Sequence, residues 1–207
     1  MRIGYSDIEA VVRSIHGSGA KPTALLGRLK YLQRFDWPPG GAKGQGSRAG
    51  YGLEQLLALM LAFELLELGL PPMRVVRLLR TGWDPTLRAM VIGWASAFGG
   101  ARPIFLALSP SALEELGMPE DETRPSPDRL MPVARSQLDA WRDDFRTGSP
   151  ALYVADPRRI ASAAKTELAE LGIVRAGDTD QAFLDLGSSL FGVNEPLIWQ
   201  VDGVRAD

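Results

Sequence analysis

Apolar positions dominate one stretch near the middle of the N-terminal half. Residues 53–68 are apolar at almost every position, and their only charged side chains are Glu54, Glu64 and Glu67. A helix that is hydrophobic around most of its circumference must be covered on most sides. We therefore expect this segment to form a core helix, ended by Gly69 and the two prolines that follow it.

A second apolar pattern begins at Pro72 and has the spacing of an amphipathic helix. Arg74, Arg77 and Arg80 recur every three residues on one side. The apolar side consists of Val75, Val76, Leu78 and Leu79. This spacing predicts a helix with a cationic face.

Two shorter helices are predicted before the core helix. A capping-box pattern starts the first at about Asp7, and its apolar positions run to Ile15. Pro22 opens the second, which runs to about Phe35. Its apolar stripe consists of Leu25, Leu29 and Leu32. We expect this stripe to pack against the first helix.

The opposite face of the second helix is rich in hydrogen-bond donors and also carries Gly27. The donors on or beside this face are Arg28, Lys30, Tyr31, Gln33 and Arg34. A helix fits the major groove of DNA, where such side chains can hydrogen-bond to base edges. Any solvated helix face displays similar residues, so for this helix alone both interpretations stay open.

A glycine-rich loop separates this helix from the core helix. Residues 38–52 contain six glycines around the cations Lys43 and Arg48. In a winged DNA-binding domain such a loop is the wing, whose tip lies along the phosphate backbone. A nucleotide-binding loop would need Gly-Lys followed by Ser or Thr, which is absent, and a flexible linker is the remaining alternative.

Residues 48–79 carry an ordered set of family-specific positions. They are Arg48, Tyr51, Leu56, Leu57, Glu64, Leu65, Leu68, Gly69, Val75, Val76 and Leu79. With this set, about the first 80 residues resemble a MerR-like winged helix-turn-helix DNA-binding domain, in which an Arg-x-x-Tyr segment closes the wing before a long apolar helix. The resemblance implies that Lys43, Arg48, Arg74 and Arg77 contact phosphate, and that the donors of the second helix read bases.

Charge divides the chain into two unlike halves. Residues 1–106 contain 13 Lys and Arg against 7 Asp and Glu, whereas residues 107–207 contain 10 against 18. A basic N-terminal half with an acidic C-terminal half fits nucleic-acid binding by the first half only. An uneven surface charge without function is the alternative.

The composition narrows the chemistry. There is no cysteine and only one histidine, so thiolate metal sites and histidine-dependent triads are not expected. We therefore expect no cofactor, no metal and no enzymatic activity. The N-terminus lacks the pattern of a signal peptide and no apolar run is long enough to span a membrane, which favours a cytoplasmic protein with no membrane segment.

The second half combines short strands with helices. After a break at residues 81–85 we expect a helix over 86–98, and a proline-rich acidic loop over 117–132. A helix with Leu138 and Trp141 follows this loop. Residues 103–113 and 150–160 align without gaps as strand, N-cap, proline and helix, which suggests a small sheet backed by helices. Coincidence is the alternative to an internal repeat. Residues 173–174 and 197–201 could add extended pieces.

These patterns predict an α+β, mainly helical chain in four parts. The parts are a winged helix-turn-helix over 1–81, a connecting helix with a strand–helix unit over 82–116, the acidic loop over 117–136, and a small acidic α/β region over 137–207. The expected function is sequence-specific binding of double-stranded DNA by a bacterial-type transcriptional regulator.

We expect this regulator to act as a homodimer. The family's usual long dimer helix is missing, so the helix around Trp94 and the strands at 104–108 and 152–155 are the expected contacts. The acidic region is a possible surface for a protein partner. The alternative is an interaction adaptor or oligomerising scaffold without DNA binding, in which the apolar helix over 53–68 forms the interface.

Overall fold

The computed structural model describes residues 1–17, 21–40, 50–97, 103–109, 129–143 and 153–193. Four helices come first: α1 (Tyr5–His16), α2 (Pro22–Arg34), α3 (Leu53–Glu67) and α4 (Pro72–Ser96). They are followed by β1 (Ile104–Ser109), β2 (Arg129–Ala134), α6 (Arg135–Asp143), β3 (Tyr153–Ala155), α7 (Pro157–Glu170) and α8 (Ala176–Phe191). The chain is mainly helical with a small antiparallel sheet, which confirms the predicted α+β class at this level.

Helix α3 is the core helix that its apolar sequence predicted. From Leu53 to Leu66 every residue except Glu54, Gln55 and Glu64 is buried. Helices α1, α4, α7 and α8 pack around it, so both halves of the chain contribute to its cover. Its first turn is held by Gln55, whose side-chain oxygen accepts a hydrogen bond from the Gly52 amide at 2.8 Å.

Helix α1 begins two residues earlier than predicted. Gly4 is its N-cap, and the Gly4 amide donates to the Asp7 carboxylate at 3.1 Å. The capping box therefore lies earlier in the chain than the sequence pattern predicted. Asp7 does cap the helix, but it does so from the third helical position, where a carboxylate can reach back to the N-cap amide.

Helix α4 joins the two halves of the chain. The break predicted at residues 81–85 is a kink inside one helix, where Gly82 has non-helical angles (φ −118°, ψ 17°) three residues before Pro85. A proline inside a helix removes a hydrogen bond and crowds the preceding turn, which accounts for a kink at this place. The predicted domain boundary at residue 81 consequently falls within α4, and the helix predicted over 86–98 is its second half.

The sheet has the strand order β2-β1-β3, and both pairings are antiparallel. Leu106 lies opposite Pro132 on one side and Ala155 on the other. The two aligned strand–helix segments therefore supply neighbouring strands. Strand β2 corrects the prediction of a loop at 117–136 for its residues 129–134. Its Pro132 is compatible with a strand because β2 lies at an edge of the sheet.

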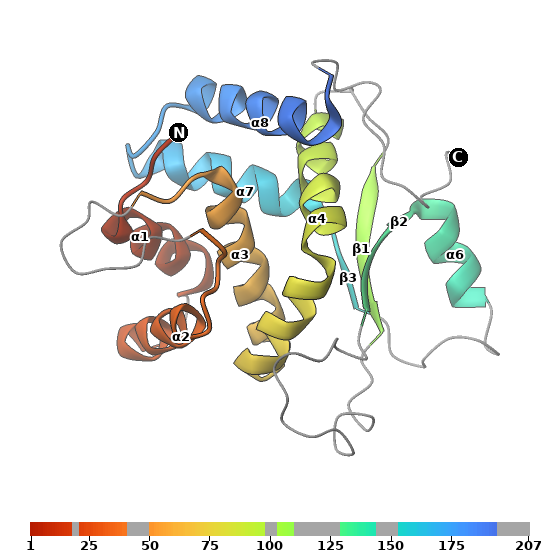
Figure 1. Ribbon diagram of the computed structural model, residues 1–207, viewed down its shortest axis with the longest axis horizontal. Helices are drawn as coiled ribbons and strands as arrows, with labels where there is room; N and C mark the ends of the chain where they lie inside the picture. The colour runs from red at the N-terminus through yellow and green to blue at the C-terminus, as the bar shows by residue number, and fades with distance from the viewer. Residues whose placement is uncertain (18–20, 41–49, 98–102, 110–128, 144–152, 194–207) are drawn as a thin grey trace.

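Helices cover both faces of this sheet. Figure 1 shows the sheet between α4 on one side and α6 on the other, with α7 and α8 stacked beside α3 and α4. Residues 173–174, predicted as an extended piece, form the turn between α7 and α8, where both amides donate to the Leu168 carbonyl. The other predicted piece, 197–201, lies outside the described residues.

Helix α7 approaches α4 very closely. A Cβ atom added to Gly93 of α4 would lie 2.7 Å from the Arg158 amide nitrogen and 2.8 Å from Pro157. Only glycine leaves room for the first turn of α7 at this point. The first turn is itself capped by Asp156, which accepts a hydrogen bond from the Arg158 amide at 3.0 Å.

Candidate nucleic-acid interface

Helix α2 is fixed to the core along its apolar side. Leu25, Leu29 and Leu32 are buried, as their spacing predicted. The chain leaving α2 is anchored by Trp37, whose indole nitrogen donates to the Ala58 carbonyl of α3 at 3.2 Å. The Trp37 ring also meets the Trp83 ring of α4 edge-on, with 5.4 Å between the ring centroids. These interactions set the direction in which the opposite face of α2 points.

The outward face of α2 carries cations and no carboxylate. Arg28, Lys30, Tyr31 and Arg34 are exposed on it, and the helix contains no Asp or Glu. Within the described part of the chain, none of the two arginines and the lysine takes part in a hydrogen bond or ion pair. A Cβ atom at Gly27 would meet no other atom of the described residues within 4 Å, so α2 is open at this position.

Gln33 does not share this outward position. Its side chain is half-buried, and its amide nitrogen donates to the Tyr51 hydroxyl at 2.9 Å. Tyr51 is in turn bridged to Ile3 by two backbone hydrogen bonds of 2.8 Å. Gln33 was predicted to read bases, but it ties α2 to this bridge. The helical wheel placed it at the flank of the face, where a neighbouring segment covers it.

The three cations of the predicted stripe on α4 have different environments. Arg74 was predicted to contact phosphate, but only 7% of its surface is exposed. Three residues of a helix turn through about 300°, which is about 60° less than a full circle. Arg74 and Arg80 lie two such steps apart, so they face directions that differ by about 120°. Arg74 therefore falls on the packed side of α4, and we withdraw it from the interface.

Arg77 and Arg80 lie beside the C-terminal end of α2. Arg77 is half-buried and borders a shallow hollow with Phe35 and Met73. Arg80 is exposed, and its guanidinium donates to the Phe35 carbonyl just beyond α2. Arg80 was expected on the cationic stripe but not in the site, because its closeness to α2 is a tertiary contact that the spacing does not reveal.

The predicted wing residues Lys43 and Arg48 lie outside the described residues.

The predicted dimer contacts are mostly occupied within the chain. Trp94 donates to Asp180 at 3.0 Å and stacks on Phe183, with 5.1 Å between ring centroids, and β1 is the central strand. Strand β3 is an edge strand whose Val154 is 41% exposed. The apolar surface of α3, the interface of the scaffold alternative, is buried by the chain itself.

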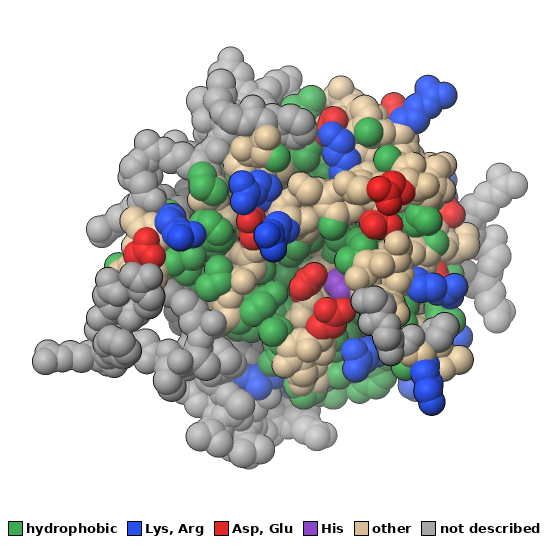
Figure 2. Space-filling model, turned by 180° about the vertical axis from the view of Figure 1, so that it is seen from behind, with side chains coloured by type: hydrophobic (Ala, Val, Ile, Leu, Met, Phe, Trp, Pro, Cys, Tyr) green, Lys and Arg blue, Asp and Glu red, His purple; other side chains and the backbone are tan. Residues whose placement is uncertain are grey.

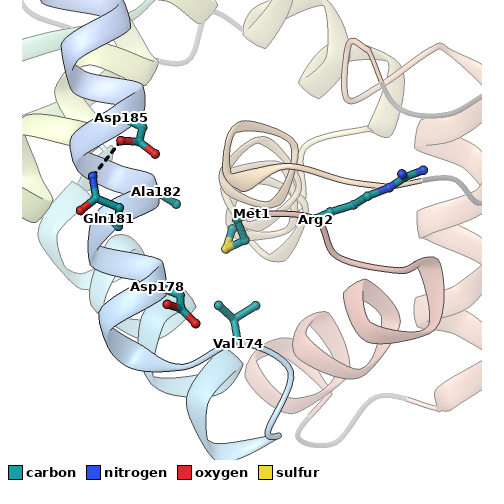
Figure 3. A pocket seen from close by; sticks show the side chains of 7 residues that line it. All are labelled: Met1, Arg2, Val174, Asp178, Gln181, Ala182 and Asp185. Carbon is teal, nitrogen blue, oxygen red and sulfur yellow. Dashed lines mark hydrogen bonds between the residues drawn. The ribbon is translucent and has the colours of Figure 1, made fainter.

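A hollow of about 360 Å³ lies between the N-terminus and α8. Its lining includes carboxylates, which the outward face of α2 lacks. Figure 3 shows Asp178 and Asp185 on the α8 side of this hollow, with Met1 opposite them and the Arg2 side chain directed away. Asp185 accepts a hydrogen bond from Gln181 at 2.8 Å. Carboxylates on this wall repel phosphate, so this hollow is no part of a nucleic-acid interface.

The described residues hold neither a candidate metal cluster nor a candidate membrane-spanning helix. They contain no group of three or more side chains arranged to hold a metal ion. No helix among them has the length and apolar content needed to cross a bilayer.

Comparison of the chain with protein-family models, with curated proteins and with solved structures gave no match.

Proposed function

We propose that the chain binds double-stranded DNA sequence-specifically, as a transcriptional regulator, through the outward face of α2. The observation that carries this proposal is the set of three exposed cations, Arg28, Lys30 and Arg34, on a helix without a carboxylate. A cation that has no carboxylate beside it contributes its full charge to an approaching phosphate backbone. The buried stripe on the other side of α2 supplies the rigid support that base readout needs.

In the proposed complex α2 enters the major groove. Arg28 and Arg34 hydrogen-bond to base edges, and the guanidinium fork matches the two acceptors of guanine. Lys30 and Tyr31 contact bases or the adjoining phosphates. Arg77 and Arg80, beside the end of α2, contact the backbone of the strand that borders the groove. We keep Lys43 and Arg48 as proposed phosphate contacts of the wing in a MerR-like winged helix-turn-helix.

One helix in one groove reads few base pairs, and regulators commonly overcome this by dimerising on a pseudo-palindrome. We propose a homodimer. Among the expected dimer contacts, the edge of β3 is favoured because Val154 is exposed and because β1 alone pairs with β3 within the described ranges.

The deciding experiment measures duplex binding against salt concentration. The test protein carries Arg28→Gln, Lys30→Gln and Arg34→Gln, and the matched control carries Arg158→Gln, Arg159→Gln and Arg175→Gln, which removes the same charge from the second half. Wild type and control should bind with the same steep salt dependence. The α2 variant should bind more weakly, and the slope should fall by about 0.9 for each phosphate that is no longer neutralised. Equal behaviour of the two variants would refute an interface on α2.

The second candidate is a protein-interaction adaptor without DNA binding. The observation that favours it is the same set of exposed cations, because such cations also complement an acidic protein surface. An adaptor of this kind does not bind a duplex even at low salt. The α2 variant of such an adaptor would still lose affinity for the protein partner. The same salt titration therefore separates the two functions.

A further inference from the structure

A second, larger hollow lies where the N-terminal helices meet the sheet. Its volume is about 690 Å³, within the range of about 300–1,000 Å³ that small-molecule sites occupy. Helices α1, α3, α6 and α7 and strands β1 and β3 all contribute to its walls. Figure 2 looks onto this side of the molecule, where hydrophobic side chains lie between basic side chains on one side and acidic side chains beside the histidine on the other.

The floor of this hollow is apolar. It is formed by Ile15, Met60, Phe105 and Ile160, which come from four different elements. A floor of this kind excludes water from a ligand that covers it, and it therefore favours a ligand with an apolar body.

One end of the hollow is acidic. Glu64 of α3 lines it and is half-buried, next to the pair formed by His16 and Glu67, whose Nδ1 and Oε1 atoms lie 2.9 Å apart. Burial, and to a smaller extent Glu67, raises the pKa of Glu64 above its usual range, while His16 lowers it. Tyr153 of β3 faces the same end, and burial together with the charges of Glu64 and Glu67 raises its pKa to about 12.

Glu64 and Tyr153 have no hydrogen-bond partner among the residues that the structure describes. The Glu64 carboxylate and the Tyr153 phenolic oxygen can therefore both accept hydrogen bonds from a ligand that supplies donors. This end therefore suits a cationic group such as a primary ammonium, which brings a charge opposite to that of Glu64 and hydrogens for both side chains.

Three arginines, Arg135, Arg158 and Arg159, also line the hollow. Arg135 and Arg158 already have carboxylate partners, because they pair with Asp139 at 3.9 Å and Asp156 at 3.0 Å. Arg159 is exposed and has no ion pair within the described ranges. An anionic group bound in the hollow could meet the Arg159 guanidinium, whose fork matches a carboxylate.

We infer that this hollow is a binding site for a small zwitterion with an apolar body, whose ammonium group meets Glu64 and Tyr153 and whose carboxylate meets Arg159. The site is distinct from the outward face of α2. It brings α3 together with β3 and α7, which lie far from α3 in the sequence, so it exists only in the folded chain.

The test uses the full chain and three forms of one probe, the dipeptide of two phenylalanines. The first form is the free zwitterion, the second has its amino group acetylated, and the third has its carboxyl group converted to an amide. Calorimetric titration measures the dissociation constant of each form. The free dipeptide should bind saturably with one site per chain, and blocking either end should weaken binding about tenfold, the effect expected for one charge-assisted hydrogen bond.

Two substitutions assign the ends. Glu64→Gln should weaken the free and the amidated dipeptide but leave the acetylated form unchanged, because the acetylated form has already lost its ammonium group. Arg159→Gln should weaken the free and the acetylated dipeptide but not the amidated form. Arg175→Gln, which removes an exposed cation at the N-terminal boundary of α8, is the control and should change none of the three.

Two results would overturn the inference. One is the lack of saturable binding by the free dipeptide. The other is binding that ignores both Glu64→Gln and Arg159→Gln, since the ligand would then lie elsewhere. A circular dichroism spectrum of each variant, unchanged from wild type, establishes that weaker binding reflects the altered side chain and not a disrupted fold.

Discussion

Helices α2 and α7 are similar in length and both begin with proline, yet they have different surroundings. Helix α7 is capped by Asp156, packs against four other helices and against β1, and contains Lys165, which is paired with Asp180 of α8 at 2.6 Å. Helix α2 has no side-chain cap, packs against α1 and α4, and leaves its cations without carboxylate partners in the described part of the chain. The difference indicates that α7 holds the fold together, whereas α2 is held so that its outer face stays available.

The largest effect should come from truncating matched buried leucines. Leu168 of α7 and Leu29 of α2 are both fully buried. Replacing either by Ala should cost about 2–5 kcal/mol of unfolding free energy. Leu168→Ala should lie near the upper end, because α7 is surrounded and cannot collapse into the cavity, and Leu29→Ala near the lower end. Urea unfolding of both variants measures this, and equal losses would contradict the contrast between the two helices.

Replacing two glycines by alanine should change stability by smaller amounts and in opposite directions. Gly93→Ala forces a methyl group against Pro157 and the Arg158 amide, and overpacking of this kind costs about 1–3 kcal/mol. Gly27→Ala adds a methyl group in open space on α2 and should stabilise the chain by about 0.5–1 kcal/mol. Thermal unfolding of the two variants should shift in opposite directions. A shift of the same sign in both would mean that α7 does not depend on the close approach at Gly93.

The hydrogen bond between Gln33 and Tyr51 distinguishes positioning of α2 from base readout. Gln33→Leu and Tyr51→Phe each remove one partner, and each should cost about 0.5–1.5 kcal/mol of stability. If Gln33 only positions α2, both variants should weaken binding to every duplex by the same factor. Loss of discrimination between duplexes in Gln33→Leu alone would return this residue to base readout.

The smallest effect concerns Glu64, which faces the α7 side of the core helix. Its pKa is raised in the folded state, so the fold binds this proton more tightly than the unfolded chain does. Stability contributed by the protonated carboxyl is complete below the usual value of 4.5 and is lost as pH rises through the folded pKa. Glu64→Gln removes that loss, so the variant should gain thermal stability relative to wild type as the pH rises from 4 to 7. A difference that stays constant over this range would contradict the raised pKa.

The packing of the first helices could be predicted from the sequence because it depends on local periodicity. An apolar residue at nearly every position leaves a helix such as α3 nowhere but the core, and the leucine stripe of α2 has one buried side for the same reason. The outward position of Arg28, Lys30 and Arg34 follows from that stripe by geometry alone. These residues were placed correctly at the surface, whereas their contact with DNA stays a prediction.

Contacts between distant segments were beyond local reasoning. Strand β2 was missed because Pro132 indicates a loop unless an edge position is known, and that position depends on its pairing with β1. Helix α8 was missed because its glycines and serines weaken the helical pattern, and its place is set by Phe183 stacking on Trp94. The environments of Arg74 and Gln33 depend in the same way on which neighbour covers each flank.

The position of α4 has a consequence for how the molecule melts. This one helix, kinked at Gly82, packs against α2 and α3 of the N-terminal half and against α7, α8 and the sheet of the C-terminal half. Loss of either half would strip apolar cover from the other, so a chain cut near residue 98 would expose Leu87, Met90 and Trp94 rather than survive as an independent module. The basic and acidic halves should share one cooperative unfolding transition. Any ligand that binds only the folded chain, on either side of α4, then raises the melting temperature of both sides together.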